Sequence, residues 1–169
     1  MDNKTYRPSL VFYRANAKGT GSAMKMELHP AHGDTAGCIM MAIASQKTVG
    51  DYRGPNPIYP TFDWENAICV KLDFIDLSKM LQVFRGECES IEEGRGLVHR
   101  SPSGLTYIKL EHLIEPIPGY RLEVEFFAGS GNSERRTVML MPCEALGLVA
   151  AIESSLGVIC FGVPMVENL

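Results

Sequence analysis

Basic and aromatic residues occur together at several places along this 169-residue sequence. Tyr13 precedes Arg14, Tyr52 precedes Arg53, and Tyr107 lies two residues before Lys109. Single-stranded nucleic acid is bound by this combination, because aromatic rings stack on unpaired bases at ~1–3 kcal/mol each and cations follow the phosphates. The pattern indicates such a surface. The candidate contacts are Lys18, Lys25, Lys47, Tyr52, Arg53, Trp64, Lys71, Tyr107, Lys109 and Arg121.

Each candidate also has a structural interpretation. Trp64 and Tyr107 fit equally well as core rings, and lysines on strand faces are commonly only solvated. The sequence leaves both alternatives open.

Catalytic, metal and cofactor sites find little support. His29 and His32 are three residues apart with Pro30 between them, and Asp34 is the one further ligand nearby, so a metal site would lack donors. The glycine runs at 19–21 and 129–131 match neither the phosphate-binding loop nor the dinucleotide fingerprint, and no GxSxG nucleophile motif occurs. We expect a protein without enzymatic activity, metal or cofactor.

The cysteines and the chain start bear on location. Five cysteines occur without a CxxC pair or regular spacing, four of them in apolar stretches, which favours small core side chains over disulfides or zinc. The first residues contain no signal-peptide core and no transit peptide. No apolar run approaches the ~20 residues that span a bilayer. We therefore expect a cytoplasmic protein with no membrane partner.

The charge is unevenly distributed. The formal net charge is −4, but residues 1–60 carry seven Lys/Arg against four Asp/Glu, whereas residues 61–100 carry five against eight and residues 101–169 four against eight. A mildly basic N-terminal third can line a groove in an acidic protein.

The elements that must position these residues are organised around residues 61–86. Residues 62–72 alternate apolar and polar or small side chains, which predicts a strand with one buried face. Leu77, Met80, Leu81 and Phe84 then follow helical spacing, with Asp76 as the expected N-cap and Gly86 as the stop.

A second strand and helix follow at residues 134–157, with Pro142 suited to the first helical position. Further strands are predicted at residues 9–15, 22–29, 38–47, 97–101, 105–114 and 120–127. Four strands and a helix thus occur twice, about residues 9–86 and 95–162, within one α+β domain that spans residues 1–169. The last helix is apolar around most of its circumference, which predicts a homo-oligomer with helices at the interface.

Several short motifs resemble, in order, those of the plant Whirly single-stranded-DNA-binding proteins. The run Phe62-Asp63-Trp64-Glu65 resembles the family's Tyr-Asp-Trp-Glu run before a helix. The stretch at residues 18–23 and the strand ending at Pro30 are similar to the family's Lys-Gly-Lys-Ala strand, residues 37–41 to its apolar strand, and residues 142–162 to its final helix. The resemblance covers roughly residues 9–162.

The resemblance implies two ββββα repeats, with two antiparallel four-stranded sheets packed roughly perpendicular and two helices. It also implies a tetramer with helices at its centre, and single strands running along the sheets and between subunits with little sequence preference. Thr20 replaces the lysine that the family uses in higher assembly, which puts assembly beyond a tetramer in question. Without an organelle-targeting segment, a bacterial or phage relative is expected.

The resulting hypothesis is a single-stranded nucleic-acid-binding protein, most simply for DNA, that acts in replication, repair or transcription. The alternative is an oligomeric scaffold or protein-interaction module of the same fold without nucleic-acid binding. Acidic charge and the few cations after residue 100 favour that alternative.

Overall fold

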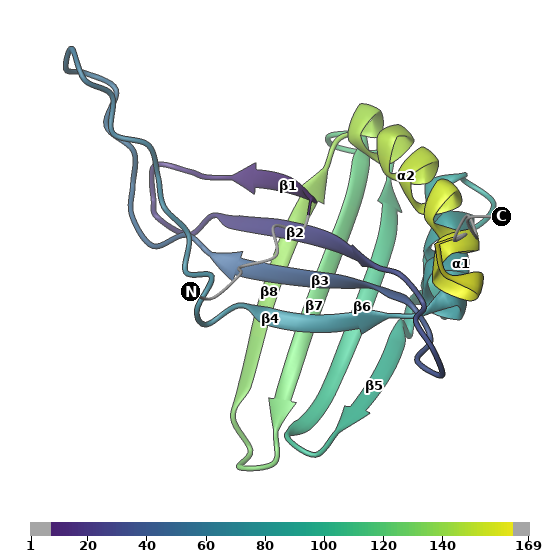
Figure 1. The fold of residues 1–169 in the computed structure, drawn as a ribbon. Helices are drawn as coiled ribbons and strands as arrows, with labels where there is room; N and C mark the ends of the chain where they lie inside the picture. The colour runs from purple at the N-terminus through teal and green to yellow at the C-terminus, as the bar shows by residue number, and fades with distance from the viewer. Residues whose placement is uncertain (1–7, 164–169) are drawn as a thin grey trace, which may run out of the picture.

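The computed structural model describes residues 8–163, which form two four-stranded antiparallel sheets and two α-helices (Figure 1). Neighbouring strands in each sheet follow chain order. The first repeat comprises β1 (Ser9–Arg14), β2 (Ser22–His29), β3 (Cys38–Ser45), β4 (Ile68–Leu72) and α1 (Phe74–Phe84). The second comprises β5 (Leu97–Ser101), β6 (Gly104–Leu113), β7 (Gly119–Ala128), β8 (Ser133–Leu140) and α2 (Pro142–Phe161), after a short 3-10 turn η1 (Ile91–Gly94).

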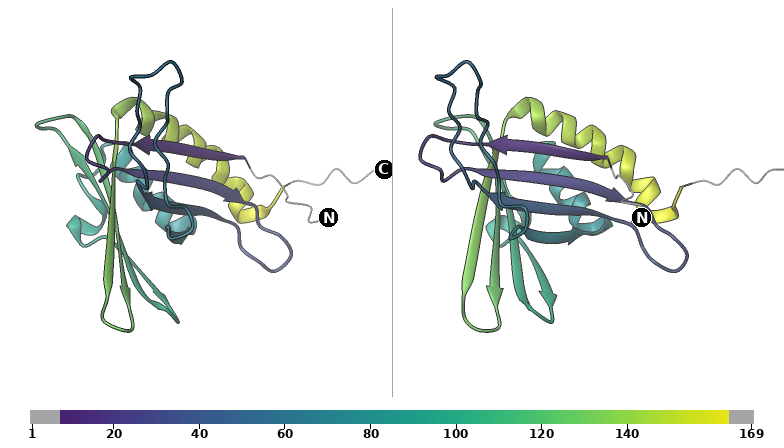
Figure 2. Two further views of the ribbon diagram at one scale, coloured as in Figure 1. Left: turned by 90° about the vertical axis from the view of Figure 1, so that its left-hand side faces the viewer. Right: turned by 60° about the vertical axis from the view of Figure 1, so that its left-hand side comes forward.

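The strands of the first sheet run across those of the second, and both helices lie at one end of the crossed sheets (Figures 1 and 2). The predicted α+β fold of two ββββα repeats with crossed sheets is therefore confirmed.

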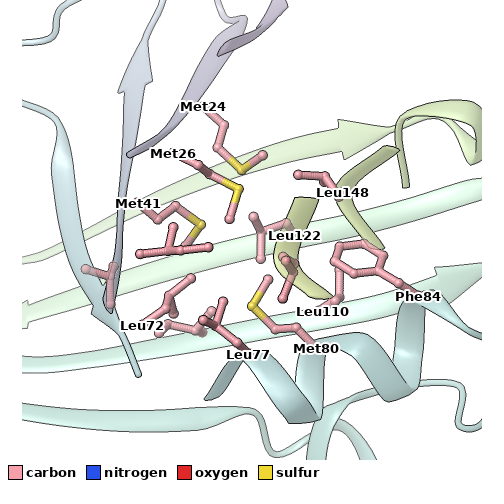
Figure 3. Close-up of a cluster of buried hydrophobic side chains, with 14 of the residues drawn as sticks. Met24, Met26, Met41, Leu72, Leu77, Met80, Phe84, Leu110, Leu122 and Leu148 are labelled. Carbon is pink, nitrogen blue, oxygen red and sulfur yellow. The ribbon is translucent and has the colours of Figure 1, made fainter. Parts of the chain in front are cut away.

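One core joins the two repeats. The alternation along each strand turns apolar side chains to the inside, where Met41 and Leu72 of the first sheet belong to the same cluster as Leu110 and Leu122 of the second (Figure 3). The helices add Leu77, Met80 and Leu148 to this cluster, and the Tyr120 hydroxyl donates a hydrogen bond to the Phe84 carbonyl oxygen at 3.1 Å. The sheets therefore hold each other with their inner faces, which leaves much of their outer faces in contact with solvent.

The start of α1 differs from the prediction. Asp73 is the N-cap, and its carboxylate accepts hydrogen bonds from the N–H groups of Ile75 at 2.8 Å and Asp76 at 3.0 Å. Asp76 is the third helical residue, and its carboxylate accepts from the Asp73 N–H at 3.1 Å. The assignment of Asp76 as N-cap was wrong because two aspartates at this spacing form a reciprocal capping box. The helix ends before Gly86, which has φ 73° as a stop requires.

The strand predicted at residues 62–72 is also shorter than expected. Phe62 forms only an isolated bridge with Gln46, and β4 begins at Ile68. Between them the Asn66 amide donates to the Asp63 carboxylate at 2.9 Å, and this local bond holds a turn in place of a ladder.

Residues 47–61 form a long hairpin that projects from the body (Figures 1 and 2). The Lys47 N–H donates to the Thr61 carbonyl at 2.7 Å at its base, and Asp51 and Ile58 exchange main-chain hydrogen bonds near its end. The prolines and glycines predicted such a surface loop. We call this segment the arm.

Helix α2 begins with Pro142 at its first turn, as predicted, and has 20 residues. Its length and composition would allow it to cross a membrane, so the expectation that no segment approaches that length was wrong: Glu144 and Glu153 interrupt the apolar run but leave the helix predominantly apolar. Here both glutamates form ion pairs with the body, Glu144 with Arg14 and Glu153 with Arg85.

The expectation that the cysteines are core side chains holds for Cys38 alone. Cys69, Cys143 and Cys160 are exposed, and Cys88 is half-buried. Cys69 faces outward on β4 by strand alternation, while Cys143 and Cys160 lie on α2, where an apolar sequence is not matched by burial.

Candidate nucleic-acid interface

Three aromatic side chains form a row on the outer face of the first sheet. Tyr13 of β1 lies 5.3 Å from Phe62 between ring centroids, and Phe62 lies 6.5 Å from Trp64. We call Tyr13, Phe62 and Trp64 the aromatic row.

Small residues of the sheet make room for the row. Tyr13 pairs with Ala23, and Ala23 pairs with Ala44, so these three are direct neighbours across β1, β2 and β3. Phe62 packs on both alanines after the arm returns the chain to the sheet. Phe62 is 9% exposed, whereas Tyr13 is 57% exposed, so the row has a buried centre and an accessible end.

Trp64 is part of this outer cluster and not of the main core. It is half-buried, and the Lys25 ammonium lies 5.7 Å from its ring centroid. The same ammonium forms an ion pair with Glu27 at 2.8 Å. Ring, cation and sheet face thus come together at one place, which is the combination that single-strand binding requires.

The outer face of the second sheet carries a second aromatic pair. Tyr107 of β6 and Phe127 of β7 pack edge to face at 5.6 Å, and with Leu105, Lys109 and Glu125 they line a shallow hollow of about 360 Å³. Tyr107 is half-buried on the outside of the sheet, so it is not a core ring.

Most charges on this second face are paired. Arg121 binds Glu111 at 2.6 Å, and Arg135 binds Glu125 at 3.0 Å. The hydrogen bond that Arg135 donates to Glu125 and the charge of Glu123 raise the pKa of Arg135. Lys109 forms no ion pair within residues 8–163 and is the free cation beside Tyr107.

The remaining candidates lie apart from the aromatic row. Lys18 is exposed in the β1–β2 turn, where the Asn16 side chain accepts a hydrogen bond from its N–H at 3.0 Å. Tyr52 and Arg53 lie on the arm, where Arg53 is ion-paired with Asp51 at 3.1 Å and lowers the pKa of that carboxyl. Lys18 is thus carried by a turn, and Tyr52 and Arg53 by the arm, whereas Lys25 lies on β2 and Trp64 follows the arm.

Lys47 lies near the aromatic row, and Lys71 lies on the outer face of the same sheet. Lys47 follows β3 at the base of the arm; a hydrogen bond from Asn66 and, more weakly, the charge of Lys47 lower the pKa of Asp63. Lys71 is exposed on the outer face of β4.

Phe62 and Phe127 were not among the predicted site residues, and Tyr13 was noted only for its neighbour Arg14. Strand alternation could have identified Phe127, since it pairs with Leu105, two residues from Tyr107 on the same face. The packing of Phe62 on Ala23 and Ala44 depends on the return of the arm, for which the sequence holds no local signal.

These two crossed sheets with their helices define a Whirly-like fold. WHY1 from Arabidopsis thaliana matches with a TM-score of 0.73 at 14% sequence identity, over 92% of this chain and 86% of that one. WHY3 from the same plant matches with a TM-score of 0.71 at 15% identity, over 93% and 90%, and the plant transcriptional regulator PBF-2 with 0.66 at 15%, over 93% and 84%. No protein-family model and no curated protein matches the sequence. At this identity the likeness concerns the fold.

Proposed function

We propose that this protein binds single-stranded nucleic acid, most simply DNA, with little sequence preference, in replication, repair or transcription. The observation that carries the proposal is the aromatic row on an accessible sheet face with Lys25 against it. Stacking on rings does not depend on base identity, because every base has a π-face. The Whirly-like fold supports the same function, since the motifs of the chain resemble single-stranded-DNA-binding proteins.

The distribution of free cations supports the proposal further. Most basic residues are neutralised by neighbouring carboxylates, but five form no ion pair in the described part of the chain: Lys18, Lys47, Lys71, Arg100 and Lys109. An acidic protein can bind a polyanion through a few such positions, although the salt-dependent part of the affinity is then small.

Reversing the charge of Lys18 and Lys25 together (K18E/K25E) should weaken binding of a fluorescein-labelled oligo-dT by roughly tenfold at low salt, because two phosphate contacts are lost and a second carboxylate is placed beside Glu27. Fluorescence anisotropy measures the affinity. The matched control is K79E/R95E, which changes the net charge equally beside η1, away from both outer faces. Equal affinities of the two double variants would remove Lys18 and Lys25 from the interface.

The scaffold alternative rests on the paired charges of the second sheet, where Arg121 and Arg135 are occupied by glutamates. The same anisotropy assay separates the two functions, with a single strand and a duplex of equal length as probes. The proposed function requires tighter binding of the single strand. If the protein binds neither probe, the scaffold alternative is favoured.

We further propose a homo-oligomer, most simply a tetramer, assembled through α2. Leu146 is 74% exposed and Phe161 is 90% exposed on this helix, whose own side chains are apolar around most of its circumference. Leu146→Glu should convert the assembly to a monomer of 18.6 kDa in multi-angle light scattering, because a buried carboxylate would be unpaired. Ile58→Glu on the arm is the control that should leave the mass unchanged. A monomeric wild-type protein would overturn the proposal.

A further inference from the structure

A cleft of about 500 Å³ lies between the free edge of the first sheet and the inner face of the second. Residues 66–71, which include all but the last residue of β4, line one side, and residues 99–101 and Ser103 line the other. Figure 1 shows why this space is open: the lower parts of β5 to β8 extend beyond β4, where no further strand of the first sheet covers them. We call this space the edge cleft.

The floor of the edge cleft is one row of neighbours across the second sheet. The register pairs His99 with Thr106, Thr106 with Phe126, and Phe126 with Glu134. All four line the cleft.

Three members of the next row inward, Leu97, Ile108 and Val124, are buried core, and its fourth member is the half-buried Arg136. The inner face of the sheet thus changes from apolar to mainly polar where the cover of the first sheet ends. If the core simply continued past the edge of the first sheet, this part of the second sheet would expose apolar residues. It instead presents hydrogen-bonding groups beside the ring of Phe126.

Two unpaired cations flank the edge cleft. Lys71 on β4 and Arg100 on β5 form no ion pair within residues 8–163. The other charged groups that line it have partners: His99 Nε2 lies 3.0 Å from a carboxylate oxygen of Asp76, and Glu134 lies 3.1 Å from Arg136. These two cations lie at the rim of the cleft: strand alternation puts Lys71 on the outer face of β4, and Arg100 lies beside Leu105 on the outer face of β5.

The remaining lining groups are neutral hydrogen-bonding partners. The hydroxyls of Ser101 and Ser103 lie 2.8 Å apart at one wall. On the opposite wall β4 is an edge strand, so half of its main-chain N–H and C=O groups point away from β3 and into the cleft.

We infer that the edge cleft binds a single nucleotide. The nucleotide's phosphate would lie between Lys71 and Arg100, and its base would lie against Phe126. The polar edge of the base would face the β4 main chain and the serine hydroxyls. The volume falls in the range of small-molecule pockets, ~300–1,000 Å³. A free mononucleotide and one unit of a strand that passes over β4 from the outer face offer the same chemistry; in the second case the inference rests on the proposed function.

The test is a titration of the ¹⁵N-labelled protein with deoxythymidine monophosphate, followed by amide chemical shifts, for wild type, R100E and R95E. Arg95 is the matched control, because it is an exposed arginine on η1's C-terminal side that does not line the edge cleft. Wild type should show shifts at residues 67–71, 99–106 and 126. R100E should bind at least about tenfold more weakly and R95E about as well as wild type, since a charged hydrogen bond is lost only in R100E. The spectra also report whether each variant is folded.

Equal weakening in R100E and R95E, or shifts outside the cleft alone, would overturn the inference. The inference would also be overturned if inorganic phosphate reproduced all the shifts at the same concentration, because the base would then make no contact. Oligo-dT anisotropy identifies the source: selective weakening of oligo-dT by R100E assigns the nucleotide to a bound strand, and unchanged oligo-dT binding with lost mononucleotide binding assigns a free nucleotide. If wild type shows no shifts in the cleft but binds oligo-dT, the inference fails and the proposed function is retained. If it shows the shifts but does not bind oligo-dT, the inference is retained and the proposed function fails.

Discussion

Replacing Tyr13 and Trp64 together by alanine is expected to weaken oligo-dT binding by about a hundredfold. Each ring that stacks on a base contributes roughly 1–3 kcal/mol, which is about 5- to 150-fold per ring, and the two losses need not add fully. Phe62 is kept, because it covers Ala23 and Ala44 and its loss would disturb the sheet. Fluorescence anisotropy over a salt series measures the effect, and the salt dependence should stay unchanged since no phosphate contact is removed.

The control keeps the rings. Y13F/W64F preserves two aromatic faces and should bind within a few-fold of wild type, whereas a role of the Tyr13 hydroxyl or the indole N–H would show as a larger loss. Thermal unfolding of the alanine variant checks that the outer cluster survives. Wild-type affinity in a folded alanine variant would mean that the outer face of the first sheet is not the interface.

The repeats and most strands could be predicted because their signal is local. Residues 22–29 alternate apolar and polar side chains, and β2 has those bounds. Pro142 marks the start of α2 because its ring suits the first helical turn. Each of these features depends on the side chains of one segment, so a single sequence contains it.

The predictions that were wrong concern features that the side chains of one segment do not determine. Asp76 satisfied the composition of an N-cap, but the choice between Asp73 and Asp76 depends on which carboxylate reaches which N–H. The β4 strand starts late because Asp63 and Asn66 bond to each other instead of continuing a ladder. Exposed Cys143 shows the same limit, since an apolar segment does not specify which of its faces is covered.

The candidate site was predicted in kind but not in arrangement. The sequence indicated rings and cations on strands, yet it grouped Trp64 with Tyr52 and Arg53, which lie on the arm, where Tyr52 packs against Tyr59 and not against the aromatic row. The aromatic row joins β1 to a segment that follows the arm, and the edge cleft joins β4 to β5. Both depend on how the two sheets and the arm meet in space, and residue spacing along the chain does not determine that.

Truncating Leu122 to alanine should destabilise the protein by about 2–5 kcal/mol, the cost of a large cavity in a packed core. Leu122 lies on β7 with no exposed surface, among side chains from both sheets and both helices (Figure 3). For a chain of this size the melting temperature should fall by roughly 4–20 °C. Leu122→Met, which conserves volume, should cost less than about 1.5 kcal/mol. Calorimetry or circular dichroism measures both variants.

The shape of the transition is as informative as its midpoint. Leu122 packs in a cluster that contains Leu72 and Met41 of the first repeat, and Tyr120 hydrogen-bonds to Phe84, so the two repeats share the main core of residues 8–163. The Leu122→Ala protein should therefore still unfold in a single cooperative step, with probes in both sheets reporting the same midpoint. Two separate midpoints, with the first sheet persisting after the second has melted, would show that the repeats are independent folding units and that the shared core does not couple the two outer faces.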